Sequence, residues 1–232
     1  MGVRDRVLQA ALECFSEEGY EHTTIARIRE RSGVSNGALF HHFSSKDAIA
    51  GALYADTIRS IHDGYRQVLA TGPGTLVDVV GGFIRHQLRW IEANPVRARF
   101  LYSQGRLDWS TDDGRRVRSM NSDVAEAYRE WLAPLIARGE VRDLPMTVMV
   151  AVVTGPAHAL AAQWLAGQLP GSVVDYADDL IDAAVAGLGG TPAAPGERTP
   201  RRIEGRVRVQ LLDPNGAVLA ETEVGTTLNP LT

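Results

Sequence analysis

Two short amphipathic segments within residues 23–47, with Gly33-Val34-Ser35 between them, limit the choice of fold more than any other stretch of the chain. Two helices joined by a turn of three or four residues that contains glycine form a helix-turn-helix. Gly33 suits the left-handed conformation that ends a first helix, and Ser35 can cap the second. The second segment begins with small side chains, which lets a recognition helix approach base edges in the major groove. The pattern therefore predicts a DNA-binding motif.

Apolar residues spaced by three and four positions predict further helices on both sides of this motif. The N-terminal helix stops at Gly19, and the helix after the motif can be capped by Ser44 or Ser45. That second helix is long, so it can connect the motif to distant parts of the chain. The predicted helices cover residues 3–18, 46–70, 76–94, 96–107, 115–136, 146–168 and 173–188. These ranges predict an all-α fold.

The last two predicted helices, 146–168 and 173–188, are rich in Ala, Val and Gly. The first of them is apolar nearly all round, which is typical of a helix that is buried on several sides. In a domain of this size a second subunit supplies that burial more easily than the rest of the chain does. Packing against a symmetry-related copy is therefore the favoured interpretation, and an entirely intrachain core is the alternative.

The chain changes character after these helices. Residues 189–202 are rich in Pro and Gly and have no apolar period, which is typical of a linker. Residues 206–212 alternate polar and apolar side chains, 213–216 form a turn sequence, and 217–224 can return as a second strand. A lone two-stranded hairpin is marginal in water. It therefore packs on the helical body, pairs with a copy in a partner subunit, or remains a disordered appendage.

The net charge, the single cysteine and the lack of long apolar runs limit which class of protein this chain can be and where in the cell it is expected. The 232 residues carry a formal net charge of −4, which argues against a protein that coats nucleic acid non-specifically. Cys14 is the single cysteine, so no intramolecular disulfide can form, and a reducing cytoplasm is expected. No window approaches the run of about 20 apolar residues that a membrane span needs, and no signal peptide is recognised. We expect a cytoplasmic protein without a membrane partner.

The stretch from 7 to 47 resembles the tetracycline-repressor (TetR) family of bacterial transcription regulators. Both the spacing and the residue types agree over about forty positions, which makes the resemblance specific. The matching residues are Phe15, Gly19, Thr23-Thr24, Ile28, Ser32-Gly33-Val34-Ser35, Gly37-Ala38-Leu39-Phe40, His42-Phe43 and Ser45-Lys46-Asp47. The remaining helices to residue 189 agree with the family in number, length and order, and the tail from 190 lies outside the resemblance.

The resemblance implies a three-helix DNA-binding domain, a larger helical ligand domain, and a homodimer formed mainly by the last two helices. By position, Thr24, His42 and Lys46 would bind phosphate, Asn36, Gly37 and Ala38 would approach base edges, and His41 would lie at the groove or the backbone. The complete predicted DNA-binding set is Thr24, Ser35, Asn36, Gly37, Ala38, Phe40, His41, His42 and Lys46. The predicted domains are a helix-turn-helix domain (1–47), a ligand-binding and dimerisation domain (48–189), a linker (190–204) and a hairpin tail (205–232).

Two residues depart from the family pattern. Phe40 stands where the family usually has Tyr, so it lacks a hydroxyl that would reach a phosphate. Arg29 stands where a small Ala is common, at the close crossing of the two motif helices. We expect Arg29 to point outward along the crossing or toward DNA.

Aromatic and His side chains on helices that should face one another form the predicted effector site. Their polar tips could orient a small apolar or amphipathic ligand inside an apolar cavity. For each residue taken alone, ordinary core packing is the competing interpretation. The set is Phe83, His86, Trp90, Phe100, Tyr128, Trp131, His158 and Trp164.

The sequence contains no motif of an enzyme active site: no nucleophile triad, phosphate loop, dinucleotide fingerprint or metalloprotease motif is present. His41-His42 lacks the partner ligands of a metal site, so no metal and no cofactor are expected. We predict a ligand-responsive regulator, a repressor that binds a palindromic operator as a homodimer. The competing class is a ligand-binding or scaffold protein that keeps a vestigial DNA-binding domain.

Overall fold

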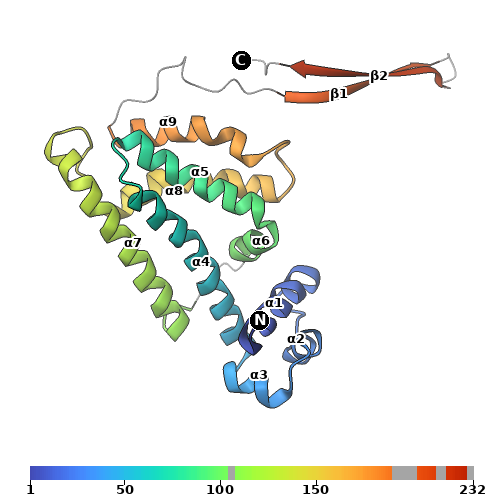
Figure 1. Ribbon diagram of the computed structural model, residues 1–232. Coiled ribbons are helices and arrows are strands. Elements are labelled where there is room, and N and C mark those ends of the chain that lie inside the picture. Colours follow the sequence, from blue (N-terminus) through green and yellow to red (C-terminus); the bar gives the residue numbers. More distant parts are fainter. Residues whose placement is uncertain (104–107, 190–202, 213–217, 229–232) are drawn as a thin grey trace. The chain divides into compact units, whose positions relative to one another are not determined.

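The computed structural model describes residues 1–103, 108–189, 203–212 and 218–228, and it places side chains in the first two of these ranges. The chain divides into two compact units, Met1–Pro192 and Ala193–Thr232. Helices build the first unit, as predicted, and a pair of antiparallel strands lies in the second (Figure 1). The predicted linker from 190 to 202 and the predicted turn at 213–216 lie outside the described residues.

Three short helices at the N-terminus form the predicted helix-turn-helix group. Gly33 adopts the left-handed conformation, with φ of 64°, and ends the second helix. The Ser35 hydroxyl accepts a hydrogen bond from the Ala38 amide at 3.2 Å, and Thr24 caps the preceding helix in the same way. The helices are α1 (Val3–Glu18), α2 (Ile25–Ser32) and α3 (Asn36–His42).

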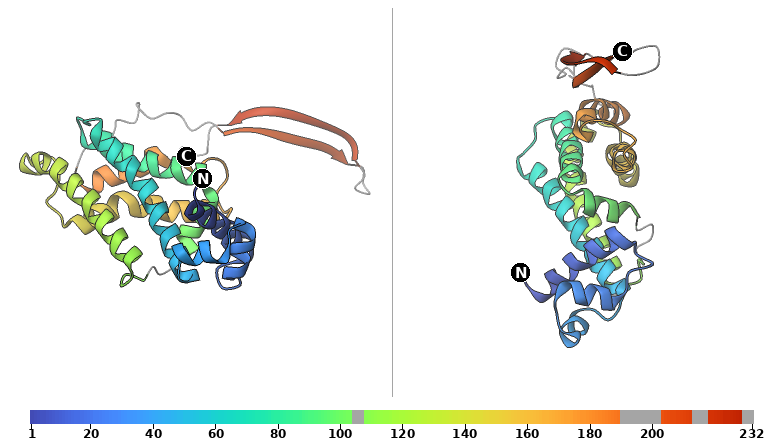
Figure 2. Two further views of the ribbon diagram at one scale, coloured as in Figure 1. Left: turned by 60° about the horizontal axis from the view of Figure 1, so that its bottom comes forward. Right: turned by 90° about the vertical axis from the view of Figure 1, so that its right-hand side faces the viewer.

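Helix α4 (Lys46–Ala70) connects this group to the other helices of the first unit (Figures 1 and 2). Of the two serines that could cap it, Ser45 does so, because its hydroxyl accepts from the Ala48 amide at 3.0 Å. Twenty-five residues extend over about 38 Å. Ile49 and Leu53 at its start belong to the buried core of α1–α3, whereas Tyr65 near its end belongs to the second core. One rigid helix therefore contributes to both cores.

The second core is enclosed by helices that follow α4. Their bounds are α5 (Leu76–Ala93), α6 (Pro95–Ser103), α7 (Asp112–Ala137), α8 (Met146–Leu165) and α9 (Ala177–Gly187). Helix α5 packs against α4, α8 and α9, and Figure 1 shows α8 passing behind α5 and α9 lying above it. The buried side chains are mainly Leu, Ile, Val and Ala, so the helices are held chiefly by apolar packing.

Three boundaries differ from the prediction by three residues or more. Helix α7 begins three residues early, because the Thr111 hydroxyl caps it by accepting from the Gly114 amide at 3.1 Å. The predicted helix 173–188 begins instead as a short 3₁₀ turn, η1 (Val173–Tyr176), and only then becomes α9. Helix α8 stops at Leu165, ahead of Gly167, whose φ of 74° is left-handed. For α6, the predicted end at residue 107 lies outside the described residues.

The prediction that no window approaches the apolar run of a membrane span is wrong for helix α8. Its 20 residues are long and apolar enough to cross a membrane, with a hydropathy of 1.4, although only 28% of that window is buried. A single stripe faces the core, and Val148 and Val150 on other faces are 42% and 38% exposed. The helix is therefore less covered by its own chain than its composition predicts.

The second unit contains β1 (Ile203–Leu212) paired with β2 (Val218–Leu228). The pairing is antiparallel and places Val207 opposite Val224, with an irregularity between Leu211 and Leu212. The two strands predicted from alternation are thus present, and both are longer than their patterns indicate. Their length increases the number of ladder hydrogen bonds that a hairpin can form.

Candidate nucleic-acid interface and effector core

The outer surface of α3 carries most of the predicted DNA-reading residues. Leu39 and Phe43 are buried beneath it and fix the helix on the core of α1–α3. Ala38 is half-buried, and Phe40 is 47% exposed in spite of its apolar ring. The exposed members of the set are Thr24, Ser35, Asn36, Gly37, Phe40, His41 and His42. An exposed, short-chained surface on a supported helix has the form that base contacts in the major groove require.

Lys46 is engaged by its own chain. Its ammonium donates to the Tyr20 carbonyl at 2.8 Å and to the Glu21 carbonyl at 3.4 Å, and it lies 4.3 Å from the centre of the Tyr20 ring. The Tyr20 hydroxyl in turn donates to the Asp47 carboxylate. Burial, followed by this carboxylate, raises the pKa of Tyr20 above its usual range. Lys46 therefore holds the α1–α2 loop against the start of α4, and its predicted contact with phosphate remains a prediction.

Most other cations of the N-terminal group are also paired. Arg4 binds Asp56 at 2.7 Å, and Arg27 binds Glu18 at 2.9 Å. Arg31 reaches back from α2 to two carboxylates of α1, Glu13 and Glu17. Such pairs reduce the positive charge that is available to phosphates.

Arg29 stands apart from these pairs. It is exposed, as expected from its departure from the family pattern, and its guanidinium makes no ion pair with any residue in 1–103 or 108–189. The first motif helix thus accommodates this large side chain by directing it to solvent. Arg29 is available to a phosphate that approaches α2.

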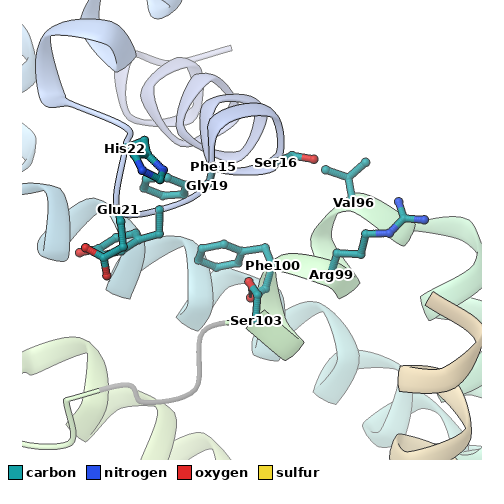
Figure 3. Close-up of a pocket in the computed structure, with 10 residues that line it drawn as sticks. Phe15, Ser16, Gly19, Glu21, His22, Val96, Arg99, Phe100 and Ser103 are labelled. Atoms are coloured by element: carbon teal, nitrogen blue, oxygen red, sulfur yellow. Dashed lines mark hydrogen bonds between the residues drawn. The ribbon is translucent and has the colours of Figure 1, made fainter. Parts of the chain in front are cut away.

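Phe100 lies apart from the other predicted effector residues, and its role in effector binding stays a prediction. It belongs to the buried core of α1–α3, where its ring stacks on Phe15 at a centroid distance of 5.7 Å and an interplanar angle of 10°. Helix α6 passes close to the end of α1, and this crossing could not be read from helical spacing. Phe100 instead lines a half-open cavity of about 700 Å³ between α1 and α6, together with Arg99 and Ser103 (Figure 3).

The polar tips of the other predicted effector residues are mostly satisfied within the chain. Trp90 donates to the Ser60 hydroxyl at 2.9 Å, and a ring nitrogen of His86 lies 3.0 Å from the Ile61 carbonyl. Trp131 donates to the Pro73 carbonyl at 3.2 Å, and Trp164 donates to the Gly171 carbonyl at 2.9 Å. These tips hold helices and loops together, so ordinary packing accounts for them.

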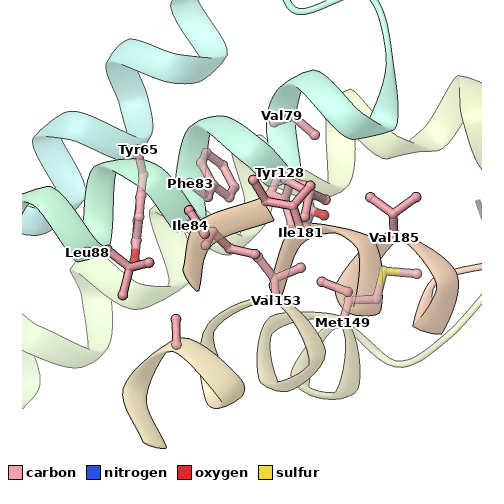
Figure 4. Close-up of a cluster of buried hydrophobic side chains, with 14 of the residues drawn as sticks. Tyr65, Val79, Phe83, Ile84, Leu88, Tyr128, Met149, Val153, Ile181 and Val185 are labelled. Atoms are coloured by element: carbon pink, nitrogen blue, oxygen red, sulfur yellow. The ribbon is translucent and has the colours of Figure 1, made fainter. Parts of the chain in front are cut away.

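Phe83 and Tyr128 do lie together at the centre of the second core. Their ring centroids are 5.3 Å apart, and Tyr65 lies 4.9 Å from Phe83 (Figure 4). Burial raises the pKa of Tyr128, and its hydroxyl has no hydrogen-bond partner among the described side chains and backbone. His158 is exposed on α8, with its ring 5.8 Å from that of Tyr102. The predicted set is therefore divided between the core centre and its surface.

The sequence-based set omitted the most unusual buried group, Gln87. Its side chain is 1% exposed, and its nitrogen Nε2 has no hydrogen-bond partner within 1–103 or 108–189. A signal was available, because Gln87 interrupts the apolar stripe of α5 between Ile84 and Leu88. A polar residue on the buried face of a helix is more informative than an aromatic one, since burying it is costly.

Comparison with known proteins agrees with this geometry. Residues 7–53 match the family model for bacterial regulatory proteins of the tetR family. The HTH-type transcriptional repressor AcnR from Corynebacterium efficiens is 30% identical over 149 residues, which cover 63% of this chain and 73% of AcnR. This chain belongs to the TetR family. It is a DNA-binding transcriptional regulator and not an enzyme.

This TetR-family chain is also similar to a second repressor in sequence and to a solved regulator in structure. The HTH-type transcriptional repressor KstR2 from Mycolicibacterium smegmatis is 32% identical over 129 residues, covering 53% of this chain and 63% of KstR2. The crystal structure of FadR from Bacillus subtilis in complex with stearoyl-CoA has a TM-score of 0.65 at 16% identity, and the match covers 79% of this chain and 98% of that structure. The TetR fold therefore extends well beyond the DNA-binding motif.

Proposed function

We propose that this TetR-family regulator is a repressor that binds a palindromic operator as a homodimer and is released by a small apolar or amphipathic effector. The observation that carries the proposal is the exposed surface of α3, where Asn36 and Gly37 stand above the buried Leu39 and Phe43. Residues 1–47 would read DNA, and residues 48–189 would bind effector and partner. Two recognition helices would enter successive major grooves about 34 Å apart.

The homodimer is supported by the exposed apolar surface of α8. Val148 and Val150 are more than one-third exposed, and Ala159 and Ala162 are also exposed. A soluble regulator rarely leaves a helix of this composition in water. A second copy that packs its own α8 and α9 there would bury these side chains, and a cytoplasmic location is consistent with that arrangement.

Two contacts would carry the effector's influence to the DNA-binding helices. Helix α4 contributes side chains to both cores, and α6 inserts Phe100 against Phe15 of α1. An effector that changes the packing of α4 or α6 would change the distance between the two recognition helices. It can do so only if it binds the two conformations with different affinities.

An apolar or amphipathic effector is supported by the composition of the second core. This core is built from aliphatic and aromatic side chains, with few polar groups among them. The similar fold of FadR from Bacillus subtilis holds stearoyl-CoA, which has a long apolar chain. An effector with an apolar body is consistent with both observations.

Selection from random duplexes tests the DNA-binding part of the proposal. The wild-type chain is expected to enrich a palindrome whose half-sites are about one helical turn apart or a multiple of it. Asn36→Ala should change base preference at one position of each half-site. Asn121→Ala, which removes an equally exposed Asn on α7, is the matched control and should leave the preference unchanged. If no palindrome is enriched at moderate salt, the chain is a ligand-binding or scaffold protein with a vestigial DNA-binding domain.

A further inference from the structure

Three side chains from α4, α5 and α6 form a polar group inside the second core, which we name the Gln87 cluster: Tyr65, Gln87 and Tyr102. The Tyr65 hydroxyl donates to the Gln87 carbonyl oxygen Oε1 at 3.0 Å. Among the residues that the structure describes, neither the buried Gln87 nitrogen Nε2 nor the buried Tyr102 hydroxyl has a hydrogen-bond partner. Burial is the larger influence on the pKa of Tyr102 and raises it, whereas the neighbouring Gln87 side chain acts to lower it.

Unpaired groups of this kind are rare in protein cores. More than nine in ten buried polar groups have a partner, and an amide without one costs free energy that a leucine would not. The buried Thr57 hydroxyl shows the usual arrangement, because it donates to the Leu53 carbonyl at 2.8 Å. The Gln87 cluster therefore keeps hydrogen-bond donors that the folded chain does not use.

The surroundings of the cluster are uncharged. Among the residues with described side chains, no Arg, Lys, Asp or Glu is buried. His62, whose ring lies 5.9 Å from that of Tyr65, has its pKa lowered to about 4, chiefly by burial, so it is neutral at pH 7. Burial raises the pKa of Tyr102 to about 12, so its hydroxyl keeps its proton. An ionised ligand group here would lose its hydration without gaining a counter-charge.

The cluster is also close to the molecular surface. Tyr102 is half-buried, and its ring meets the exposed His158 of α8 edge-on at 5.8 Å. Tyr102 is therefore the member of the cluster that reaches toward the molecular surface. The ring of Phe83 lies 4.9 Å from that of Tyr65 and supplies an apolar wall beside this member of the cluster.

We propose that the Gln87 cluster binds an uncharged carbonyl oxygen of the effector, such as that of a ketone, an ester or an amide. Gln87 Nε2 and the Tyr102 hydroxyl donate to this one oxygen, and the apolar body of the ligand lies against Phe83. The inference rests on the proposed function, because it assumes that this core receives an effector. The inference adds that hydrogen bonds from the Gln87 cluster select a neutral carbonyl compound over the related carboxylate and over a hydrocarbon.

Stability measurements test whether the cluster is structural. Tyr65→Phe/Gln87→Leu removes both members of the hydrogen bond and the unpaired amide together. If the cluster serves ligand binding, this variant should unfold at the wild-type temperature or above it, because an apolar replacement of a poorly paired group is neutral or stabilising. A lower melting temperature, measured by circular dichroism on the full chain, would show that the cluster holds the fold and would overturn the proposal.

Binding measurements test the chemistry with two matched sets of probes. The first set is acetophenone, benzoate and ethylbenzene, and the second is methyl decanoate, decanoate and undecane. In thermal-shift and ligand-observed NMR titrations, the neutral carbonyl member of at least one set should bind about tenfold or more tightly than its two partners. Tyr102→Phe and Gln87→Leu should each weaken it about tenfold. Tyr54→Phe, the same change at a half-buried tyrosine near the DNA-binding core, is the control and should bind normally.

The outcomes separate this inference from the proposed function. Equal binding by a carboxylate or hydrocarbon member, equal binding by the Gln87→Leu variant, or no binding by either carbonyl probe overturns the inference. The selection of duplex DNA uses probe-free protein, so its failure would remove the repressor assignment and leave the carbonyl result intact. If DNA selection succeeds and the carbonyl probes do not bind, only the ligand chemistry assigned to the Gln87 cluster is wrong.

Discussion

Replacing Phe100 by leucine is expected to remove a specific interaction between α6 and α1, measurable as a coupling energy with Phe15. The two side chains are 5% and 7% exposed, and their rings are nearly parallel at 5.7 Å. Each Phe→Leu change should cost roughly 1 kcal/mol through lost packing. The aromatic pair itself contributes about 0.5–1.5 kcal/mol beyond buried area, and only this part is shared by the two changes.

A double-mutant cycle isolates that shared part. The wild type, the two single variants and the double variant are unfolded in urea at one fixed protein concentration, since a dimer's stability depends on concentration. The double variant should be less destabilised than the sum of the single variants, by about 0.5–1.5 kcal/mol. Phe15→Leu combined with Phe83→Leu is the control, because Phe83 belongs to the other core and its effect should be additive. A coupling no larger than in this control would refute the interpretation that α6 and α1 are joined through Phe100.

Three further predictions concern single side chains. Lys46→Ala should weaken binding to all DNA sequences about equally and should lower the slope of log affinity against log salt concentration by about one. Because the ammonium binds two loop carbonyls, the same change should lower the melting temperature. A changed base preference would contradict the phosphate contact. The pKa of His62 is lowered to about 4 in the folded chain, so the unfolded chain binds more protons between about pH 6.5 and 4. The wild type should therefore lose up to about 3 kcal/mol of stability relative to His62→Leu as pH falls through that window, and a pH-independent difference would disprove it. Gly64→Ala should destabilise the chain by about 1–3 kcal/mol, since the added methyl group would overlap the His86 ring. Gly64→Ala/His86→Ala should recover stability in the same urea assay, whereas no recovery would place the strain elsewhere.

Local features of the fold were accessible from sequence because they depend on residues only a few positions apart. The cap of α3 joins Ser35 to Ala38, and the cap of α4 joins Ser45 to Ala48. Gly33 ends α2 through its own backbone conformation. Such interactions are encoded within one turn, so spacing and residue type are sufficient to predict them.

The DNA-binding surface was partly accessible in the same way. Exposure of Asn36 and Gly37 follows from the helical period, once Leu39 and Phe43 are assigned to the core. The partners of Lys46 do not follow, because Tyr20 and Glu21 lie 26 and 25 positions away. A sequence pattern identifies Lys46 as a cation near the motif, and only the packed loop decides which oxygens bind it.

Sequence alone determined that this chain forms helices, where most of them begin and end, and that residues 23–47 make a helix-turn-helix of the TetR type. Tertiary structure decided that Phe100 enters the core of α1–α3 and that most predicted effector residues have partners within the chain. It also decided that Gln87 Nε2 has no partner in the part of the chain that the structure describes. The physical reason is the range of the interactions. Helices follow from contacts within four residues, whereas the environment of Gln87 is set by crossings between α4, α5 and α6 that no single period encodes.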